Sequence, residues 1–181
     1  MFYRQVLEIY ATSIDYDPRA SVSQEFFKKV QNKIHYAIHG RTAAELIVER
    51  ADSEKDFMGL LTFKGSQPTL AEARTAKNYL DDKELRSMGQ LVSGYLDFAE
   101  RQAEKEQPMT MNDWANYLDR ILTSTGEQLL LDGGRVSHQE AMDHATTEYR
   151  KYKQRTLSDV EQDYLNAIKA ISDKSKKGGK K

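Results

Sequence analysis

Apolar side chains recur at intervals of three and four residues along most of the chain, which is the spacing of one face of an α-helix. The clearest stripe follows Asp81 and comprises Leu85, Met88, Leu91, Val92, Tyr95, Leu96 and Ala99. Further stripes predict helices over 23–39, after Thr42, after Thr69, over 114–122, over 137–152 and over 158–171. The pattern therefore predicts an all-α fold, a single multi-helix domain of about seven helices.

Signals for helix starts support these elements. A Ser, Thr or Asp followed three residues later by Glu or Gln satisfies two unpaired amides at a helix start, an arrangement called a capping box. The pairs that fit are Ser21/Gln24, Thr42/Glu45, Thr69/Glu72, Asp81/Glu84, Ser137/Glu140 and Ser158/Glu161. Helix ends are predicted at Gly40, which suits a left-handed cap, and near Pro108, because the residue before a proline disfavours the α conformation.

Two segments depart from the helical pattern. The apolar residues of 58–65 are few and lie among glycines, so we expect either a short extended excursion or an irregular loop there. The end of the chain from Asp173 holds five lysines, one aspartate and the Gly178-Gly179 pair, which predicts a solvated tail. We therefore expect a helical domain over 1–171 and a disordered lysine-rich tail over 172–181.

Composition and charge exclude several classes of function. The 181 residues include 27 Lys and Arg against 28 Asp and Glu, and the basic tail leaves the rest of the chain acidic, which argues against a broad nucleic-acid-binding face. Without cysteine there is no disulfide framework, thiolate zinc site or cysteine nucleophile. No apolar run approaches the roughly 20 residues that span a bilayer, and Arg4 and Glu8 interrupt any signal-peptide core. We expect a cytoplasmic protein with no cofactor and no membrane partner.

The stretch 26–52 holds the residues most suited to a site. His35 and His39 are four apart, so they share one face of the predicted helix over 23–39, while Glu45 and Asp52 share a face of the helix that Thr42 begins. Two imidazoles at this spacing are a zinc-ligand geometry, but Tyr36 stands where metalloproteases need a glutamate, so we expect no metal site. A structural role is the favoured interpretation, and ligand binding or acid–base chemistry stays open as the alternative.

Further candidates come from a second motif and from polar residues elsewhere. The string from His39 to Ala43 resembles the end of the core motif of Fic-type AMP-transferases, which use a histidine as base and a glycine-rich helix start to hold phosphates. The Gly-Asn-Gly element of that motif is missing here. Lys77 and Asn78, at the end of the helix after Thr69, and His138, in the first turn of its helix, are further ligand-binding candidates.

Several strings taken together resemble the RhuM family of virulence-associated bacterial proteins. They are Phe26-Phe27, Val30-Gln31-Asn32-Lys33, His35, His39-Gly40, Thr42-Ala43-Ala44-Glu45, Arg50-Ala51-Asp52, Met58-Gly59-Leu60, Ala76-Lys77-Asn78-Tyr79-Leu80, Tyr95-Leu96-Asp97-Phe98-Ala99-Glu100, Pro108-Met109-Thr110-Met111, Asp113-Trp114, Leu118-Asp119 and Val136-Ser137-His138. The resemblance covers about residues 1–170 and is to the C-terminal region of the family's proteins, which an N-terminal DNA-binding or regulatory module typically precedes. It implies no biochemical activity.

Two functions follow as hypotheses. The favoured one is an interaction or regulatory helical module that binds a protein partner or associates with itself. The alternative is a Fic-like or toxin-type enzyme acting on a nucleotide or nucleic acid, although the acidic charge does not support such a partner. In the enzyme His39 would be the base, Glu45 or Asp52 an orienting acid, and Arg50 a phosphate clamp, with His35, Thr42, Lys77, Asn78 and His138 around the ligand.

Overall fold

The computed structural model describes residues 2–17, 19 and 21–178, and it leaves undescribed the side chains of some helical residues, most of them beyond Thr156. The described residues form helices and no strand, which confirms the all-α class. The α-helices are α1 (Phe2–Ala11), α2 (Ser21–His39), α3 (Ala43–Arg50), α4 (Leu70–Ala73), α5 (Asp82–Glu104), α6 (Met111–Ser124) and α7 (His138–Gly178). Two short 3₁₀ helices, η1 (Asp56–Gly59) and η2 (Ala76–Tyr79), lie between them.

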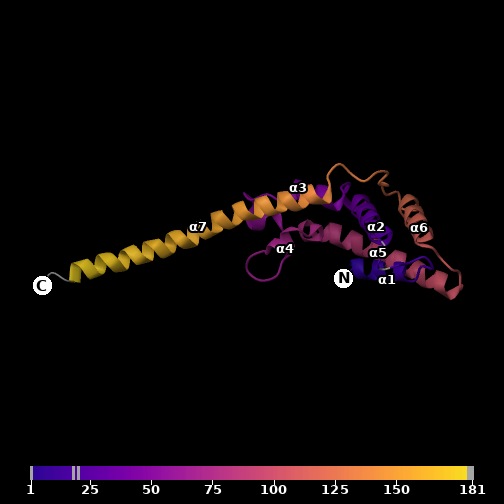
Figure 1. Cartoon of the computed structure of the whole chain (residues 1–181), viewed down its shortest axis with the longest axis horizontal. Coiled ribbons are helices and arrows are strands. Elements are labelled where there is room, and N and C mark those ends of the chain that lie inside the picture. Colours follow the sequence, from indigo (N-terminus) through magenta and orange to yellow (C-terminus); the bar gives the residue numbers. More distant parts are fainter. Residues whose placement is uncertain (1, 18, 20, 179–181) are drawn as a thin grey trace.

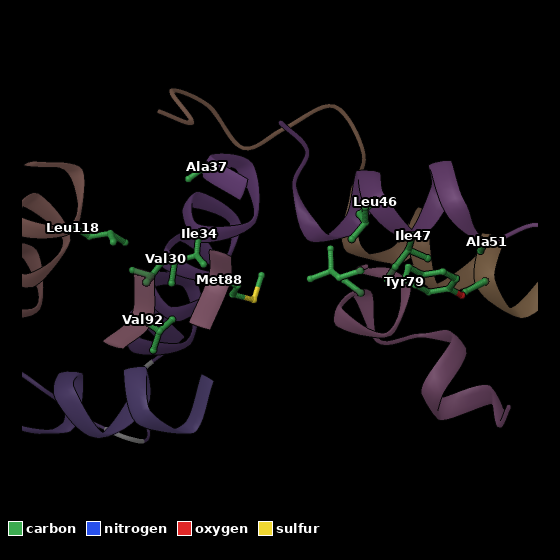
Figure 2. Close-up of a cluster of buried hydrophobic side chains, with 14 of the residues drawn as sticks. Val30, Ile34, Ala37, Leu46, Ile47, Ala51, Tyr79, Met88, Val92 and Leu118 are labelled. Carbon is green, nitrogen blue, oxygen red and sulfur yellow. The ribbon is translucent and has the colours of Figure 1, made fainter. Parts of the chain in front are cut away.

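Helix α2 lies at the centre of the body and contacts α3, α5 and α6. Its predicted inward stripe is confirmed, because Val30 and Ile34 are fully buried, facing Met88 and Val92 of α5 (Figure 2). Lys33 of α2 is buried as well, and its ammonium lies 2.5 Å from a carboxylate oxygen of Asp119 on α6. Helix α2 can therefore contact three other helices, because its buried positions include both apolar residues and Lys33, which is paired with Asp119.

An aromatic cluster joins α1 to the same core. The Tyr10 ring packs edge-on against Phe26 and Phe27 of α2, with centroids 4.9 and 5.6 Å apart. Its hydroxyl lies 3.0 Å from that of Tyr95 on α5, and Tyr95 donates a 2.6 Å hydrogen bond to the carbonyl of Trp114 on α6. Burial raises the pKa of both phenols, so they remain neutral donors. The apolar pattern did not predict α1 as a helix.

Helix α3 packs between η2 and the first half of α7. Leu46 and Ile47 of α3 are buried beside Tyr79 of η2 (Figure 2). On the other side, α7 presents the fully buried Ala141 and Ala145, whose small side chains allow the two helices to approach closely. The body therefore has one core shared by α1, α2, α5 and α6 at one end and by α3, η2 and α7 at the other (Figure 1).

Capping boxes begin most of these helices, as predicted. The reciprocal bonds form at Thr42/Glu45, Thr69/Glu72, Asp81/Glu84 and Ser137/Glu140. A further capping box at Thr110/Asp113 begins α6. The sequence rule did not predict it, because the rule requires Glu or Gln at the second position and this box has aspartate. The predicted helix start at Ser158/Glu161 is wrong, since α7 runs through this point as one helix. The predicted capping box at Ser21/Gln24 does not begin α2, because Ser21 is already the first residue of that helix.

The stretch 58–65 is not extended. Phe57, Met58 and Gly59 form a left-handed turn with φ of 50°, 49° and 85°, which buries the Met58 side chain completely, and an irregular loop follows. Non-glycine residues rarely adopt this conformation, so its enclosed position against α3 explains why it persists. Of the two expectations for this stretch the irregular loop is confirmed, and the extended excursion is wrong.

Helix α7 differs most from the sequence pattern. The two helices predicted over 137–152 and 158–171 are one helix of 41 residues, because no glycine or proline interrupts the residues between them. This helix also includes residues 172–178 of the segment that we expected to be a disordered tail, while residues 179–181 lie outside the described residues.

Replacing Gly59 by alanine should destabilise the fold. A Cβ there would lie 2.4 Å from the backbone oxygen of Arg50, and φ is +85°. We expect the free energy of unfolding, measured by urea denaturation, to fall by at least about 2 kcal/mol. The matched control is Gly94→Ala, in the middle of α5 with open space around it, which should raise stability by about 0.5–1 kcal/mol. Equal effects at both positions would contradict this explanation.

Candidate functional site

His35 and His39 contact each other at the end of α2. His35 Nδ1 lies 3.0 Å from His39 Nε2, so one ring donates a hydrogen bond and the other accepts it. Burial is the main cause that lowers the pKa of His35 to about 3, and the neighbouring His39 contributes to the same shift. Burial also lowers the pKa of His39, to about 4. Both imidazoles are therefore neutral at neutral pH.

The surroundings of His39 hold opposed charges. Glu84 raises its pKa and Arg50 lowers it, so the two effects offset each other and burial decides the direction. His39 Nδ1 is buried without a hydrogen-bond partner in the described part of the chain. A base with so low a pKa is weak at neutral pH, which is poorly matched to general-base catalysis.

Arg50, the candidate phosphate clamp, is engaged within the protein. Its Nη1 and Nη2 donate to the two carboxylate oxygens of Glu84 at 2.7 and 2.6 Å, and Nη1 also donates to the Tyr79 carbonyl at 2.8 Å. The bond from Arg50 holds the pKa of Glu84 below its usual range, and Glu84 raises the pKa of Arg50. This two-bond pair joins the last turn of α3 to the first turn of α5.

Glu45, the candidate acid, is also engaged. Oε2 accepts the Thr42 backbone amide at 2.8 Å within the capping box, and Oε1 accepts the Arg135 amide at 2.7 Å from the loop before α7. Burial alone would raise the pKa of Glu45, but the bonds from Arg135 and Thr42 outweigh it and hold the pKa below its usual range. Thr42 is buried, and a Cβ on Gly134 would lie 2.6 Å from its methyl group. Glu45 and Thr42 thus tie the 130–136 loop to the start of α3.

The remaining candidates separate into two groups. Asp52 accepts the Glu54 amide at 3.0 Å in the turn after α3, and the buried Asn78 donates from its side chain to the Glu72 carbonyl at 3.0 Å. Lys77 and His138 instead line one cavity of about 260 Å³ together with His35. Glu45 lines a different cavity of about 490 Å³, between α3 and the 130–136 loop. The structure therefore brings together His35, Lys77 and His138 around one cavity and keeps His39 in contact with His35, whereas Glu45, Asp52 and Asn78 lie elsewhere.

Several residues that hold this region were not among the candidates. Glu84 was visible only as a capping residue, and its partner lies 34 positions away. Glu148 of α7 accepts the Ser53 amide at 2.8 Å and the Lys151 ammonium at 2.6 Å; the bond from Lys151 lowers its pKa to about 2. His144 lies 3.0 Å from the Ala51 carbonyl. No local pattern marks such long-range partners.

Within residues 2–17, 19 and 21–178, no group of three or more His, Cys, Asp or Glu could hold a metal ion. None of the helices there is both long and apolar enough to cross a membrane.

Comparison with known proteins agrees with the resemblance seen in the sequence. A model of the virulence protein RhuM family matches residues 1–160. No curated protein and no solved structure matches the chain. The chain belongs to the virulence protein RhuM family.

Stability should fall as the pH is lowered from about 7.5 to about 5. The unfolded imidazoles titrate near 6.5, whereas the folded pKa values of His35 and His39 are about 3 and 4. Below about pH 6.5 the unfolded chain therefore binds more protons, so this stabilisation is fully present above about 6.5 and is lost toward about 4.

At about pH 5, His35 alone should account for roughly 2 kcal/mol. The measurement is urea unfolding at both pH values for the native chain and for the double variant His35→Gln/His39→Gln. The variant should show the smaller pH dependence. Identical slopes for the two proteins would contradict the neutral pair.

Removing the Glu45 carboxylate should loosen the start of α3. Glu45→Ala leaves the amides of Thr42 and Arg135 without their acceptor, so we expect a loss of about 1–2 kcal/mol in urea unfolding. Glu49→Ala on the same helix is the control, because its partner Arg41 is exposed and such pairs contribute about 0.5 kcal/mol or less. A loss at Glu49 as large as that at Glu45 would contradict the assigned role.

Proposed function

We propose that this member of the virulence protein RhuM family is a helical interaction module, and that the far half of α7 pairs with the same segment of a second copy. The observation that carries the proposal is the projection of α7 from the body (Figure 1). We call residues 157–178 of α7 the arm.

The first half of α7 is anchored and the arm is not. Glu148 and Tyr152 are buried against the body, and Arg155 donates from Nη1 to the Glu54 carbonyl at 3.0 Å. Beyond that point the helix continues away from the other elements (Figure 1). The whole helix of 41 residues is about 60 Å long, and roughly half of it belongs to the arm.

In proteins most of the stability of a helix comes from packing of its apolar face against other elements. The arm has such a face in its sequence, because apolar residues recur at alternating intervals of three and four. They are Leu157, Val160, Tyr164, Ala167 and Ile171. Tyr164 and its neighbour Ile168 are 67% and 44% exposed. This spacing is that of a helix that pairs with another helix in a coiled coil.

Charge in the arm favours a second copy as the partner. The first half of the arm carries Asp159, Glu161 and Asp163, and the second half carries Lys169, Lys174, Lys176 and Lys177 against the single acid Asp173. Two arms that pair antiparallel place the acidic half of each beside the basic half of the other, whereas parallel pairing would place like charges together. The arm is therefore self-complementary in the antiparallel orientation.

The enzyme hypothesis has less support. Its proposed acid, Glu45, and its proposed clamp, Arg50, both bond to other groups of the protein. His39 would be a weak base, since burial lowers its pKa to about 4. These contacts support structural roles for the three residues.

Self-association predicts a dimer that depends on the apolar face of the arm. We expect the chain to be dimeric in light scattering coupled to size-exclusion chromatography, and the variant Tyr164→Glu/Ile168→Glu to be monomeric. The control is Leu131→Glu, which adds one negative charge, half of what the double variant adds, at a leucine that is 92% exposed in the loop before α7 and should leave the dimer intact. A monomeric native chain at high concentration would refute the proposal.

The orientation is tested by disulfide formation, because the chain has no cysteine of its own. Antiparallel pairing brings the arm centres together, so Ala167→Cys should cross-link two copies under oxidation. Ser158→Cys and Ser175→Cys, near opposite ends of the arm, should not do so singly. Cross-linking of each end variant would show parallel pairing and overturn the antiparallel model.

A further inference from the structure

The cavity that contains His35, Lys77 and His138 has a chemistry that neither the family nor the arm accounts for. It is about 260 Å³ in volume and lies between α2, α3, η2 and α7. We propose that this cavity, which we call the basic cavity, binds a small phosphate-type anion: inorganic phosphate or the phosphate of a monoester.

The polar groups of the basic cavity are donors or cations. Arg74 directly follows α4 and Lys77 lies in η2, while Gln31 and His35 come from α2 and His138 from the first turn of α7. Among the described residues that line it there is no carboxylate. In a body whose overall charge is acidic, a cavity lined by two cations and no acid attracts anions selectively.

The two cations are held differently. The Arg74 guanidinium donates from Nε and Nη2 to the Thr146 hydroxyl at 3.2 and 2.8 Å, which fixes its plane against α7 without neutralising its charge. Lys77 is exposed and has no ion-pair partner in the described part of the chain. Arginine with its planar guanidinium and lysine with its ammonium point charge both bind phosphate oxygens.

The cavity between α3 and the 130–136 loop has a different charge balance, because acids line it beside its arginines. The cavity of about 490 Å³ also has two arginines, Arg41 and Arg135, in its lining. There the Arg41 guanidinium lies 2.6 Å from a Glu49 oxygen, and Glu45 and Asp132 line the same space. Its cations therefore have acids beside them, whereas those of the basic cavity do not.

Helix starts add to the positive potential. Ala43 and Ala44, the first two residues of α3, line the basic cavity, as does His138 at the first position of α7. The first amides of a helix carry partial positive charge and suit anions. The Ala43 amide donates to Asn32 Oδ1 at 3.3 Å, and the Ala44 amide has no acceptor among the described residues.

The size of the cavity limits the ligand. Pockets for drug-sized molecules measure roughly 300–1,000 Å³, so about 260 Å³ suits a phosphate group and little more. Inorganic phosphate would be enclosed, and the phosphate of a monoester would enter with its remaining part in solvent. Both sources present the same oxygens to Arg74 and Lys77.

The test is isothermal titration of the full chain with inorganic phosphate, with adenosine 5′-monophosphate and with adenosine at constant ionic strength. We expect saturable binding of at least one phosphate-bearing probe and none of adenosine. Binding of phosphate alone identifies the free ion as the ligand, and tighter binding of the monophosphate identifies an ester. Absence of saturable binding for both phosphate-bearing probes overturns the proposal.

The binding residues are tested with matched lysines. Lys77→Gln should weaken binding at least tenfold, whereas Lys64→Gln, at an exposed lysine outside the cavity, should bind as the native chain does. Unchanged urea midpoints confirm that both variants fold. Equal affinity of the two variants would place binding elsewhere and overturn the assignment. The monomeric variant Tyr164→Glu/Ile168→Glu should retain native affinity, so failure of the arm model and failure of the anion site are distinguishable.

Discussion

The paired bonds between Arg50 and Glu84 are the constraint around which the rest of the body is arranged. They join the end of α3 to the start of α5 at 2.6 and 2.7 Å, and both side chains are largely withdrawn from solvent. Glu84 also accepts the Asp81 amide that begins α5, while Arg50 also donates to the Tyr79 carbonyl that ends η2. One ion pair thus sets the direction of two helices and a 3₁₀ turn. Exposed pairs such as Arg41–Glu49 contribute little to stability and do not join several elements in this way.

The neutral state of the two histidines is a consequence of their burial rather than of this ion pair. His39 lies near both members of the ion pair, whose effects on its pKa oppose each other, so the cost of burying a charge decides its state. His35 is more deeply buried and has His39 as its neighbour, and a proton on either ring would repel the other. A pair of imidazoles that share one hydrogen bond is compatible with the packed interior at the end of α2.

Surface chemistry is divided between two distant parts of the molecule. The arm of α7 carries an apolar face with charges of both signs and projects away from the body (Figure 1). The basic cavity opens on the surface of the body, beside the first residues of α3 and α7. Another helix would cover the apolar face of the arm, and an anion would balance the cations of the basic cavity. An interaction module with a phosphate-type ligand site is consistent with both features.

Local chemistry in the sequence was enough to determine the all-α class, four of the six predicted capping boxes and the buried stripe of Val30 and Ile34. These depend on residues at most a few positions apart, so spacing reveals them. The candidate residues His35 and His39 were correctly placed in contact for the same reason. Spacing also predicted that Lys77 and His138 are polar residues near helix ends, but it did not predict that they line the same cavity as His35.

Only the tertiary structure decided what those residues do. Glu45 and Arg50 had the chemistry of a site, yet their partners Arg135 and Glu84 are distant in the chain and engage them in the fold. The left-handed turn at Met58 and the continuity of α7 also depend on packing or on the absence of a break, which periodicity does not report. Contacts between distant segments arise when helices pack, and no local pattern contains that information. The family can therefore be recognised from the sequence, whereas the cavity and the projecting arm are seen only in the tertiary structure.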